Sequence, residues 1–323
     1  MVLCVLPSAA QKKKDQLQKP MAGPRATALR VSWLYVSADV GAQKVGRVQP
    51  GREMVVAEKS GDWLRVYANT DIEEEHTADQ PIFDTNETTP PISGWMQAKG
   101  VVIENTPNGD QILLGAGAEQ EALASDPRGP VNAARTAHLI YRRLVEMFPN
   151  SPLDAEAAWR AADILWQIQK ADASTRPSAK EQAPYLREQM DEDPLKHVIR
   201  DYPHTKEADY AAYELVENKL CGDWQGQEKC PEKEAEIYEK FAGEHPDGPR
   251  TAQALYQAVY RQAALTDMYG ADNNDKKSEA AHGHARDLAA RLREKFPQSD
   301  YAARATTIVF KLDQGIPVYG IER

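Results

Sequence analysis

Two cysteines in the second half of the chain have the spacing of a disulfide. Cys221 and Cys230 enclose the segment CGDWQGQEKC, whose glycines and polar residues are typical of a loop between two helices. In an oxidising compartment such a pair closes a disulfide, which would stabilise the fold by about 2–3 kcal/mol in the chain-entropy model. The alternative is two unrelated thiols in a reducing compartment. A zinc site would need a second Cys/His pair with matching spacing, which the sequence lacks.

Aromatic side chains could supply a binding surface. Trp33 and Tyr35 lie in a segment that we predict to be a loop, and we expect them to line a groove for an extended peptide. Trp63 and Trp95 stand within strand patterns and are predicted to fill a core. Most aromatic residues of the second half have the spacing of helix packing, although some could anchor a partner on an open face. The residues that we predict to bind a partner there are Tyr210 and Tyr256.

No motif for catalysis, for a cofactor or for a metal occurs in the sequence. It contains no G-x-S-x-G, no H-E-x-x-H, no phosphate-binding P-loop, and no G-x-G-x-x-G after a strand pattern. His282 and His284 are two positions apart and do not share a helical face, so we predict a solvated helix start there. The acidic run Glu73–Glu75 with His76 is predicted to be a surface loop, because a calcium loop needs alternating ligands and a glycine bend. We therefore expect a protein that is not an enzyme and has no cofactor and no metal.

The charge of the chain argues against nucleic-acid binding. Its 323 residues include 39 Lys and Arg against 49 Asp and Glu, which gives a formal net charge of −10. An acidic surface repels phosphate, and the sequence has no stripe of basic residues. Hydrophobic residues make up 41% of the chain, as in soluble globular proteins, and no apolar run approaches the roughly 20 residues that span a bilayer.

Residues 1–26 are predicted to be the end of a signal peptide and a flexible tether. In the opening MVLCVLPSAAQKKK, residues 2–6 are apolar and residues 8–10 have the small side chains of a signal-peptidase site. The apolar stretch is short, so we interpret it as part of a longer leader, with a frayed N-terminus as the alternative. Cys4 does not follow a small residue, which argues against a lipid anchor. We expect a soluble bacterial protein of the periplasm, or a secreted one.

Residues 27–103 are predicted to form a small all-β domain. Short alternating or β-branched segments are separated by turn signals such as QPG and SGD. An acidic insertion rich in Pro and Thr, residues 69–91, interrupts the pattern, and residues 104–130 form a connector that is partly helical. The predicted strands are 28–31, 44–48, 54–58 and 63–67, and the strand signal resumes at 92–96 and ends near 101–103.

A short phrase that recurs four times predicts stacked helical hairpins in residues 131–315, followed by a tail at 316–323. Its copies are FPNS at 148–151, YPHT at 202–205, HPDG at 245–248 and FPQS at 296–299. Apolar residues with helical spacing flank each copy, so the proline would end one helix and the residues after it would cap the next. One hairpin cannot bury its apolar face alone, and stacked neighbours would complete the core. Long loops are expected at 170–184 and 269–279.

The β region resembles a bacterial SH3 domain. The segments that carry the resemblance are LRV at 29–31, KVGRVQPG at 44–51, SGDWLRV at 60–66 and SGWMQAKGVV at 93–102. The resemblance implies a small barrel with a peptide-binding role. The chain departs from the family's pattern by the inserted residues after Tyr67, and by Ser32-Trp33 where the family has an arginine-led turn.

The repeated phrase resembles that of tetratricopeptide repeats. The segments YRRLVEMFPNSPLDAEAAWRAA at 141–162 and ARLREKFPQSDYAARA at 290–305 place alanines at every third or fourth position after aromatic-Pro-x-Ser. They are similar to the repeats of the periplasmic Tol–Pal coordinator and of the outer-membrane barrel-assembly lipoprotein. This resemblance implies scaffolding of protein complexes at a bacterial envelope.

These patterns predict a multi-domain chain, with an all-β SH3-like barrel followed by an all-α array of helical hairpins. The expected function is a non-enzymatic adaptor that binds envelope proteins, without nucleic acid and without spanning the membrane. The alternative is a peptidoglycan-targeting module that acts with a separate cell-wall hydrolase. A third hypothesis, an enzyme with an unrecognised site, would require clustered buried carboxylates or histidines.

Overall fold

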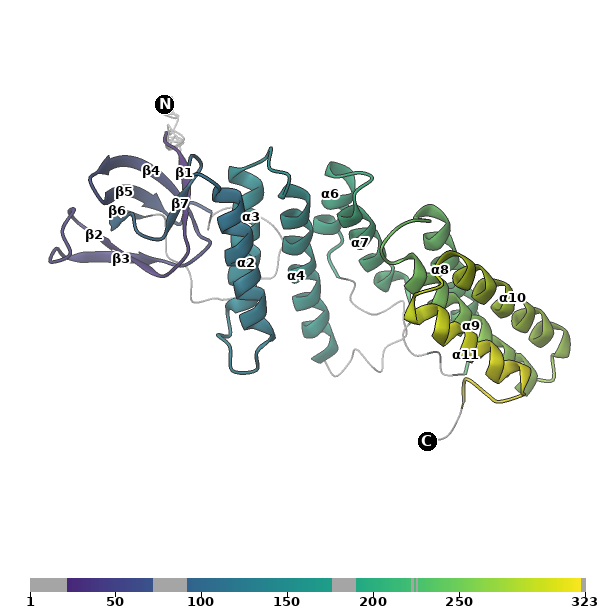
Figure 1. Cartoon of the computed structure of the whole chain (residues 1–323). Coiled ribbons are helices and arrows are strands. Elements are labelled where there is room, and N and C mark those ends of the chain that lie inside the picture. Colours follow the sequence, from purple (N-terminus) through teal and green to yellow (C-terminus); the bar gives the residue numbers. More distant parts are fainter. Residues whose placement is uncertain (1–21, 72–91, 176–189, 222–223, 225, 321–323) are drawn as a thin grey trace, which may run out of the picture. The chain divides into compact units, whose positions relative to one another are not determined.

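The computed structural model describes residues 22–71, 92–175, 190–221, 224 and 226–320 (Figure 1). The chain divides into two compact units, unit 1 up to Pro107 and unit 2 from Asn108. The described strands lie in unit 1, and the described α-helices lie in unit 2. The predicted order of a β domain followed by an α domain is therefore confirmed.

Unit 1 contains a seven-stranded antiparallel sheet in its described residues, with the strand order β3-β2-β6-β5-β4-β1-β7. The strand predicted at 28–31 is misplaced, because β1 ends at Ala28 and residues 29–31 form the turn between β1 and β2. The strand predicted at 44–48 is confirmed, and the strand signal expected to end near 101–103 ends in β7. The strands are β1 Arg25–Ala28, β2 Ser32–Tyr35, β3 Lys44–Val48, β4 Glu53–Ser60, β5 Trp63–Ala68, β6 Ile92–Gln97 and β7 Val101–Ile103.

Alternation along the strands gives the sheet an apolar inner face. Leu64 and Val66 of β5 are fully buried, as is Met96 of β6, while Arg65 between the first two is exposed. Gly46 of β3 lies so close to the side chain at the start of β6 that any added Cβ would collide with it. The inner face therefore forms a single small core, and the outer face is free to carry other chemistry.

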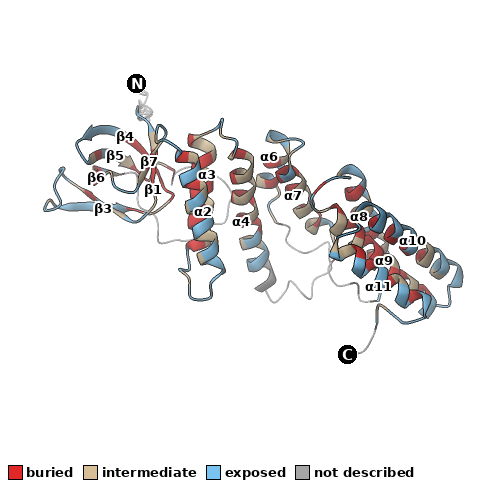
Figure 2. Cartoon of the chain, in the orientation of Figure 1, coloured by how far each residue is buried: buried red, intermediate tan, exposed pale blue. Residues whose placement is uncertain are grey.

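Unit 2 contains nine α-helices in its described residues. They pack in consecutive pairs, α3 with α4, α6 with α7, α8 with α9 and α10 with α11, and α10 also packs on α9. Figure 2 shows that the buried residues follow the faces that meet neighbouring helices. The helices are α2 Gly109–Ser125, α3 Ala133–Met147, α4 Asp154–Thr175, α6 Asp193–Asp201, α7 Lys206–Glu214, α8 Lys229–Glu244, α9 Thr251–Ala271, α10 Asp275–Lys295 and α11 Asp300–Asp313, with a short 3₁₀ turn, η2, at Glu217–Lys219.

The first helix of each pair ends in the same way. The residue before each repeated proline has φ between −129 and −122° and ψ between 53 and 60°, and its N–H still donates to the carbonyl four residues back. A residue that precedes proline is sterically disfavoured in the helical conformation, so the helix must stop there. The predicted proline-terminated hairpins are thus confirmed. The four terminating residues are Phe148, Tyr202, His245 and Phe296.

Hydroxyl side chains after the prolines start the next helices. Thr205 Oγ1 accepts a hydrogen bond from the backbone N–H of Ala208 at 3.2 Å, and Ser299 Oγ accepts one from Tyr301 at 3.2 Å. Such caps satisfy amide groups that have no partner within the helix. The repeated phrase therefore encodes both the end of one helix and the beginning of the next.

Three expectations about connections are corrected. The connector at 104–130 contains a complete helix, α2, which packs on α3 and belongs to unit 2. The loop expected at 269–279 is short, because Gly270 continues α9 and Asn274 caps α10 through its side chain. In the loop expected at 170–184, α4 continues to Thr175, and the remainder lies outside the described residues. The same holds for residues 1–21 and for 72–91 of the insertion.

The contact of α2 with α3 depends on a glycine. A Cβ at Gly117 would overlap the ring of Tyr141, which is fully buried, whereas a Cβ at Gly115 would meet no atom within 4 Å. Gly117→Ala is therefore expected to lower the free energy of unfolding by about 2 kcal/mol. Gly115→Ala, the matched control on the same helix, should raise it by about 0.5–1 kcal/mol, because glycine disfavours helix. Urea denaturation measures both, and an equal gain for the two variants would refute the close contact.

Candidate functional site

Three helices of unit 2 bring an aromatic pair and an arginine together. Trp159 of α4 stacks on Tyr210 of α7, with ring centroids 4.8 Å apart and an interplanar angle of 26°. The guanidinium of Arg250, at the N-terminal end of α9, lies 5.3 Å from the ring centre of Tyr210 and 5.8 Å from that of Tyr213. All four side chains are partly exposed. Each of these side chains is thus partly desolvated and keeps some exposed surface in the described structure.

Two carboxylates lie one helical turn beyond the aromatic stack. Asp163 follows the tryptophan of the stack by four residues, and Glu214 follows the tyrosine by four, so each shares a helix face with its ring. One further turn along, Trp166 Nε1 donates a hydrogen bond to Glu217 Oε2 at 3.1 Å, between residues 51 positions apart. In the sequence, the two stacked rings are as far apart as Trp166 and Glu217 are, and so are the two carboxylates. Asp163 and Glu214 therefore lie across from each other on neighbouring helices that run in the same direction.

Burial raises the pKa of both carboxyl groups. The pKa of Glu214 rises to about 7, first because burial disfavours the carboxylate and then because the charges of Asp163 and Glu217 lie nearby. Burial also raises the pKa of Asp163. Arg250 and Lys170 favour the ionised forms, but they offset burial only in part.

The two carboxylates differ in their partners. Asp163 accepts a hydrogen bond from the side chain of Gln167, on its own helix, at 2.9 Å. Within the described residues, Glu214 has neither a hydrogen bond nor an ion pair through its side chain. Lys170 pairs with Glu217 at 2.5 Å and not with Glu214. A partly buried carboxylate that has no ion-pair partner in the described structure is a candidate for binding a cationic group of a ligand.

Only part of this cluster could be expected from the sequence. Tyr210 lies in it, but Tyr256, the other tyrosine predicted to bind a partner, packs against Tyr301 of α11 with ring centroids 5.6 Å apart. The carboxylates were missed because they are far apart in the sequence and belong to no local motif. The one signal was an aromatic residue followed four positions later by a carboxylate, repeated on the second helices of two successive hairpins.

The outer face of the sheet in unit 1 carries a second aromatic group. Trp33 is 44% exposed, and the Nζ atom of Lys44 lies 4.3 Å from its ring centre. Tyr35 contacts Trp63 edge-on, with ring centroids 5.7 Å apart, and is opposite Trp95 in the strand register. These rings, together with Lys44, form a partly exposed surface with a positive charge at one side.

Two predictions about these aromatic residues are corrected. Trp33 and Tyr35 lie in strand β2 and not in a loop. The sequence did not reveal this strand, because four residues are too few to show a clear alternation. Trp63 and Trp95 were predicted to fill the core, but both are partly exposed and alternate with the buried residues of β5 and β6. Strand periodicity alone does not say which of the two alternating sets faces inward.

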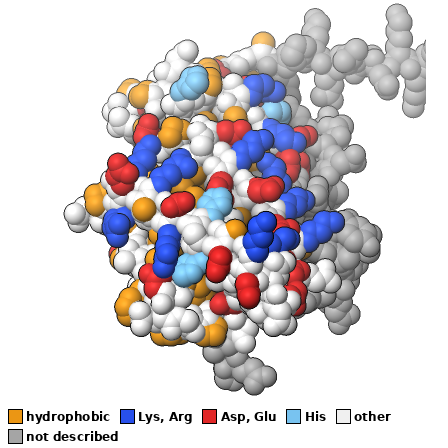
Figure 3. Space-filling view, turned by 90° about the vertical axis from the view of Figure 1, so that its right-hand side faces the viewer, with side chains coloured by type: hydrophobic (Ala, Val, Ile, Leu, Met, Phe, Trp, Pro, Cys, Tyr) orange, Lys and Arg blue, Asp and Glu red, His pale blue; other side chains and the backbone are white. Residues whose placement is uncertain are grey.

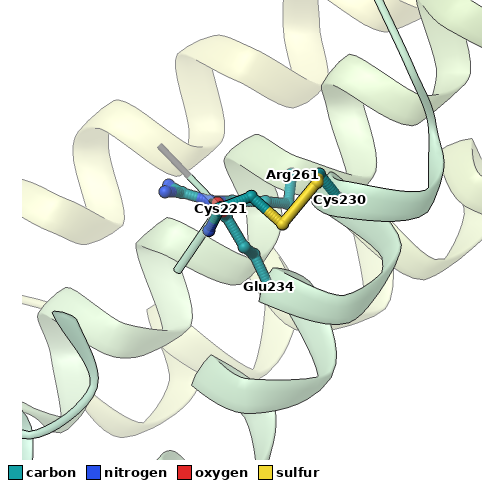
Figure 4. Close-up of a disulfide and its surroundings, with 4 residues drawn as sticks. All are labelled: Cys221, Cys230, Glu234 and Arg261. Carbon is teal, nitrogen blue, oxygen red and sulfur yellow. Dashed lines mark hydrogen bonds and ion pairs between the residues drawn. A yellow bond between two sulfur atoms is a disulfide. The ribbon is translucent and has the colours of Figure 1, made fainter. Parts of the chain in front are cut away.

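The predicted disulfide between Cys221 and Cys230 is present, with the two Cα atoms 5.9 Å apart (Figure 4). Beside it, Glu234 is 1% exposed and accepts a hydrogen bond from the backbone N–H of Cys221 at 2.8 Å. The other oxygen of Glu234 pairs with Arg261 Nε at 3.1 Å. The guanidinium of Arg261 also lies 5.5 Å from the ring centre of Trp224 in the disulfide loop. One buried ion pair therefore fixes this loop on α8 and α9.

The tail after α11 folds back onto unit 2. Asp267 of α9 accepts hydrogen bonds from the backbone N–H groups of Val318 and Tyr319 at 2.6 and 2.8 Å. The ring of Tyr319 lies 5.4 Å from that of Trp224. Between the tail and α9 lies a cavity of about 580 Å³, whose lining includes Thr266, Asp267, Met268, Leu312 and Ile316. The tail is thus part of the packed structure up to residue 320.

The two histidines lie within α10 and not at a helix start. His282 Nε2 is 2.9 Å from a carboxylate oxygen of Asp313 on α11, and His284 Nε2 is 3.0 Å from one of Glu239 on α8. They therefore face different neighbours, as their spacing predicts. Among the described residues, no group of three His, Cys, Asp or Glu side chains could hold a metal, and no helix has both the length and the apolar character to cross a membrane. The acidic run at 73–76 lies outside these residues.

Comparisons with known proteins leave the function to be argued from this geometry. No protein-family model and no curated protein matches the chain. Among solved structures, the DHF58 filament is similar at 15% identity, over 64% of this chain and 91% of that chain, with a TM-score of 0.23. A score of this size carries no argument about fold or function.

The pKa of Glu214 leads to a test of how this site affects stability. Its pKa is raised from an ordinary value of 4.5 to about 7 in the folded state, so stability should fall as the pH rises through this range. Glu214→Gln removes the penalty, and should raise the free energy of unfolding by about 1 kcal/mol at pH 8, with little gain at pH 4. Urea denaturation at the two pH values measures this difference. Glu294→Gln, an exposed position on α10, is the control, and a loss of stability for Glu214→Gln at pH 8 would refute the argument.

The disulfide leads to a second test. Replacing both cysteines by serine should lower the free energy of unfolding by about 2–3 kcal/mol, because the unfolded chain then gains conformational freedom. Reduction of the unaltered protein should have the same effect on its urea denaturation curve. If the reductant leaves the curve unchanged, the disulfide does not contribute to stability as described.

Proposed function

We propose that this protein is a non-enzymatic adaptor of the bacterial cell envelope. Unit 2 acts as a tetratricopeptide-like array that binds a segment of a partner protein, and unit 1 acts as an SH3-like module that binds a second ligand. The observation that carries the proposal is the open cluster in which Trp159 stacks on Tyr210 beside Arg250. Tryptophan, tyrosine and arginine are the residues that contribute most to protein–protein binding energy when they cluster in a partly desolvated patch.

The architecture supports this proposal. Repeated helical hairpins present side chains from successive units along one surface, and such surfaces suit an extended protein segment. In unit 2 the cluster draws on three successive hairpins, through α4, α7 and α9. The Cys221–Cys230 disulfide supports an oxidising compartment such as the periplasm, because disulfides rarely persist in the cytosol.

The charges on one face of unit 2 suit a protein partner better than nucleic acid. Figure 3 views unit 2 from the side on which α10 and α11 lie in Figure 1, and basic and acidic side chains alternate there without a field of one sign. Nucleic-acid binding requires a concentrated basic patch that displaces counterions from phosphates.

An enzyme would need a pocket that encloses its substrate. The pair of Asp163 and Glu214 is a cluster of partly buried carboxylates, which the enzyme hypothesis required. However, it lies beside an open aromatic stack, and the cavity of about 580 Å³ near the tail has different lining residues. The surroundings of the pair therefore favour binding over catalysis.

The outer face of the sheet supports the alternative function, a peptidoglycan-targeting module that acts with a separate cell-wall hydrolase. Trp33 and Tyr35 lie on one face of β2, and Trp33 is 44% exposed beside Lys44. Such a face suits a cell-wall peptide with carboxylate groups, because aromatic rings contact its apolar parts and a cation pairs with its charge.

A photo-crosslinking experiment tests the adaptor function. A benzophenone amino acid replaces Tyr210 in the full chain, which is produced in the native cell. We expect one defined protein partner to be crosslinked, and its yield to fall at least fivefold when Trp159→Ala is added. The same amino acid at Arg291, an exposed position on α10, is the control. Equal products from the two positions would contradict the proposal.

Sedimentation with purified peptidoglycan distinguishes the alternative function from the adaptor function. If the adaptor function alone is correct, the full chain should stay in the supernatant. Pelleting that Trp33→Ala abolishes, and that Tyr210→Ala leaves intact, would instead support peptidoglycan targeting through unit 1. The two variants lie in different units, so each also serves as a folding control for the other.

A further inference from the structure

Asp163 and Glu214 oppose each other, and within the described residues neither side chain forms an ion pair. They occupy matching positions on two helices that run in the same direction, between the Trp159–Tyr210 stack and the hydrogen bond from Trp166 to Glu217. Like charges at facing positions destabilise a fold, and burial adds to that cost. Binding sites commonly sacrifice stability, so this destabilising pair is a candidate binding group.

Arg250 and Lys170, the described cations that act on the pair, have other partners. The guanidinium of Arg250 lies over the rings of Tyr210 and Tyr213, and its NH1 group donates a hydrogen bond to Gln253 at 3.0 Å. Lys170 pairs with Glu217. In the described part of the chain, the carboxylate of Glu214 therefore has no ion-pair partner. An external cation would supply one.

The aromatic stack indicates what kind of cation fits. The Trp159 and Tyr210 rings lie one turn from the carboxylates on the same helix faces. A lysine or arginine side chain has an apolar stem and a charged head, so its stem can lie on the rings while its head reaches the carboxylates. A bare metal ion would gain nothing from the rings, and two carboxylates alone provide too few ligands for it.

We propose that Asp163 and Glu214 together bind the cationic head of a lysine or arginine side chain from the partner segment, with its stem against the Trp159–Tyr210 stack. This inference rests on the proposed function, and it names the chemistry of the partner. It predicts that the bound segment carries a basic residue at one fixed position. The charged groups of the described residues that act on the pair are Lys170 on α4, Glu217 beyond α7, Arg250 at the start of α9 and Glu121 on α2.

The test is a selection of random 12-residue peptides on the full chain at pH 8, where Glu214 is ionised. We expect the selected peptides to share one Lys or Arg position. Fluorescence anisotropy with the consensus peptide then measures affinity. Glu214→Gln and Asp163→Asn should each weaken binding at least tenfold, because a charge-assisted contact is lost. Glu294→Gln changes the net charge equally at an exposed site and should leave binding unchanged.

A double-mutant cycle assigns the contact. Replacing the basic residue of the peptide by norleucine keeps the stem and removes the charge, so it should weaken binding as much as Glu214→Gln does. The two changes together should cost no more than one of them, since both remove the same contact. Because Glu214→Gln is expected to stabilise the fold at this pH, a loss of binding with normal urea denaturation would not reflect unfolding.

Other outcomes overturn the inference in distinguishable ways. Peptides that depend on Tyr210 but show no basic position would refute the cation site and leave the adaptor function in place. Binding that Glu214→Gln does not change would refute the assigned contact. Failure of every peptide to bind would count against both the cation site and the proposed function. Competition by millimolar Ca²⁺, with no preference for a basic residue, would show a metal site instead.

Discussion

The structure of unit 2 depends on a steric rule about proline. The residue before a proline is excluded from the helical region, so four helices end at Phe148, Tyr202, His245 and Phe296 with nearly the same backbone angles. A repeated angle repeats the direction in which the chain turns back. The second helices of successive hairpins can then run side by side. A turn with more variable backbone angles would give each helix pair a different orientation.

The candidate site is a consequence of this regular arrangement. Because α4 and α7 run in the same direction, residues at a constant separation meet three times, as stacked rings, as facing carboxylates and as a hydrogen-bonded pair. Two of these contacts stabilise the fold, and the carboxylates between them do not. The attractive contacts hold the repulsive one in place. This is how a rigid scaffold can maintain a binding group that would separate on a flexible surface.

The sequence predicted features that local sterics decide and missed those that depend on packing. The hairpin ends followed from X-Pro geometry, and the Cys221–Cys230 bond followed from a short loop. The helix at 109–125 was only partly expected, because its glycines resemble a linker and one of them is needed for contact with Tyr141. Which face of β5 and β6 points inward could not be read from alternation. The facing of Asp163 and Glu214 requires the register of two helices, which no short segment contains.

The end of the chain has an unexpected part in holding the last hairpins together. Asp267 binds two successive backbone amides of the tail, and Tyr319 packs on Trp224 inside the loop that the cysteines close. The residues after α11 therefore serve as a clasp that joins the third hairpin to the fourth. Insertions would therefore be tolerated differently at different positions. An insertion after residue 320 leaves the clasp intact. An insertion between α11 and Val318 shifts the two backbone amides away from Asp267 and breaks their hydrogen bonds.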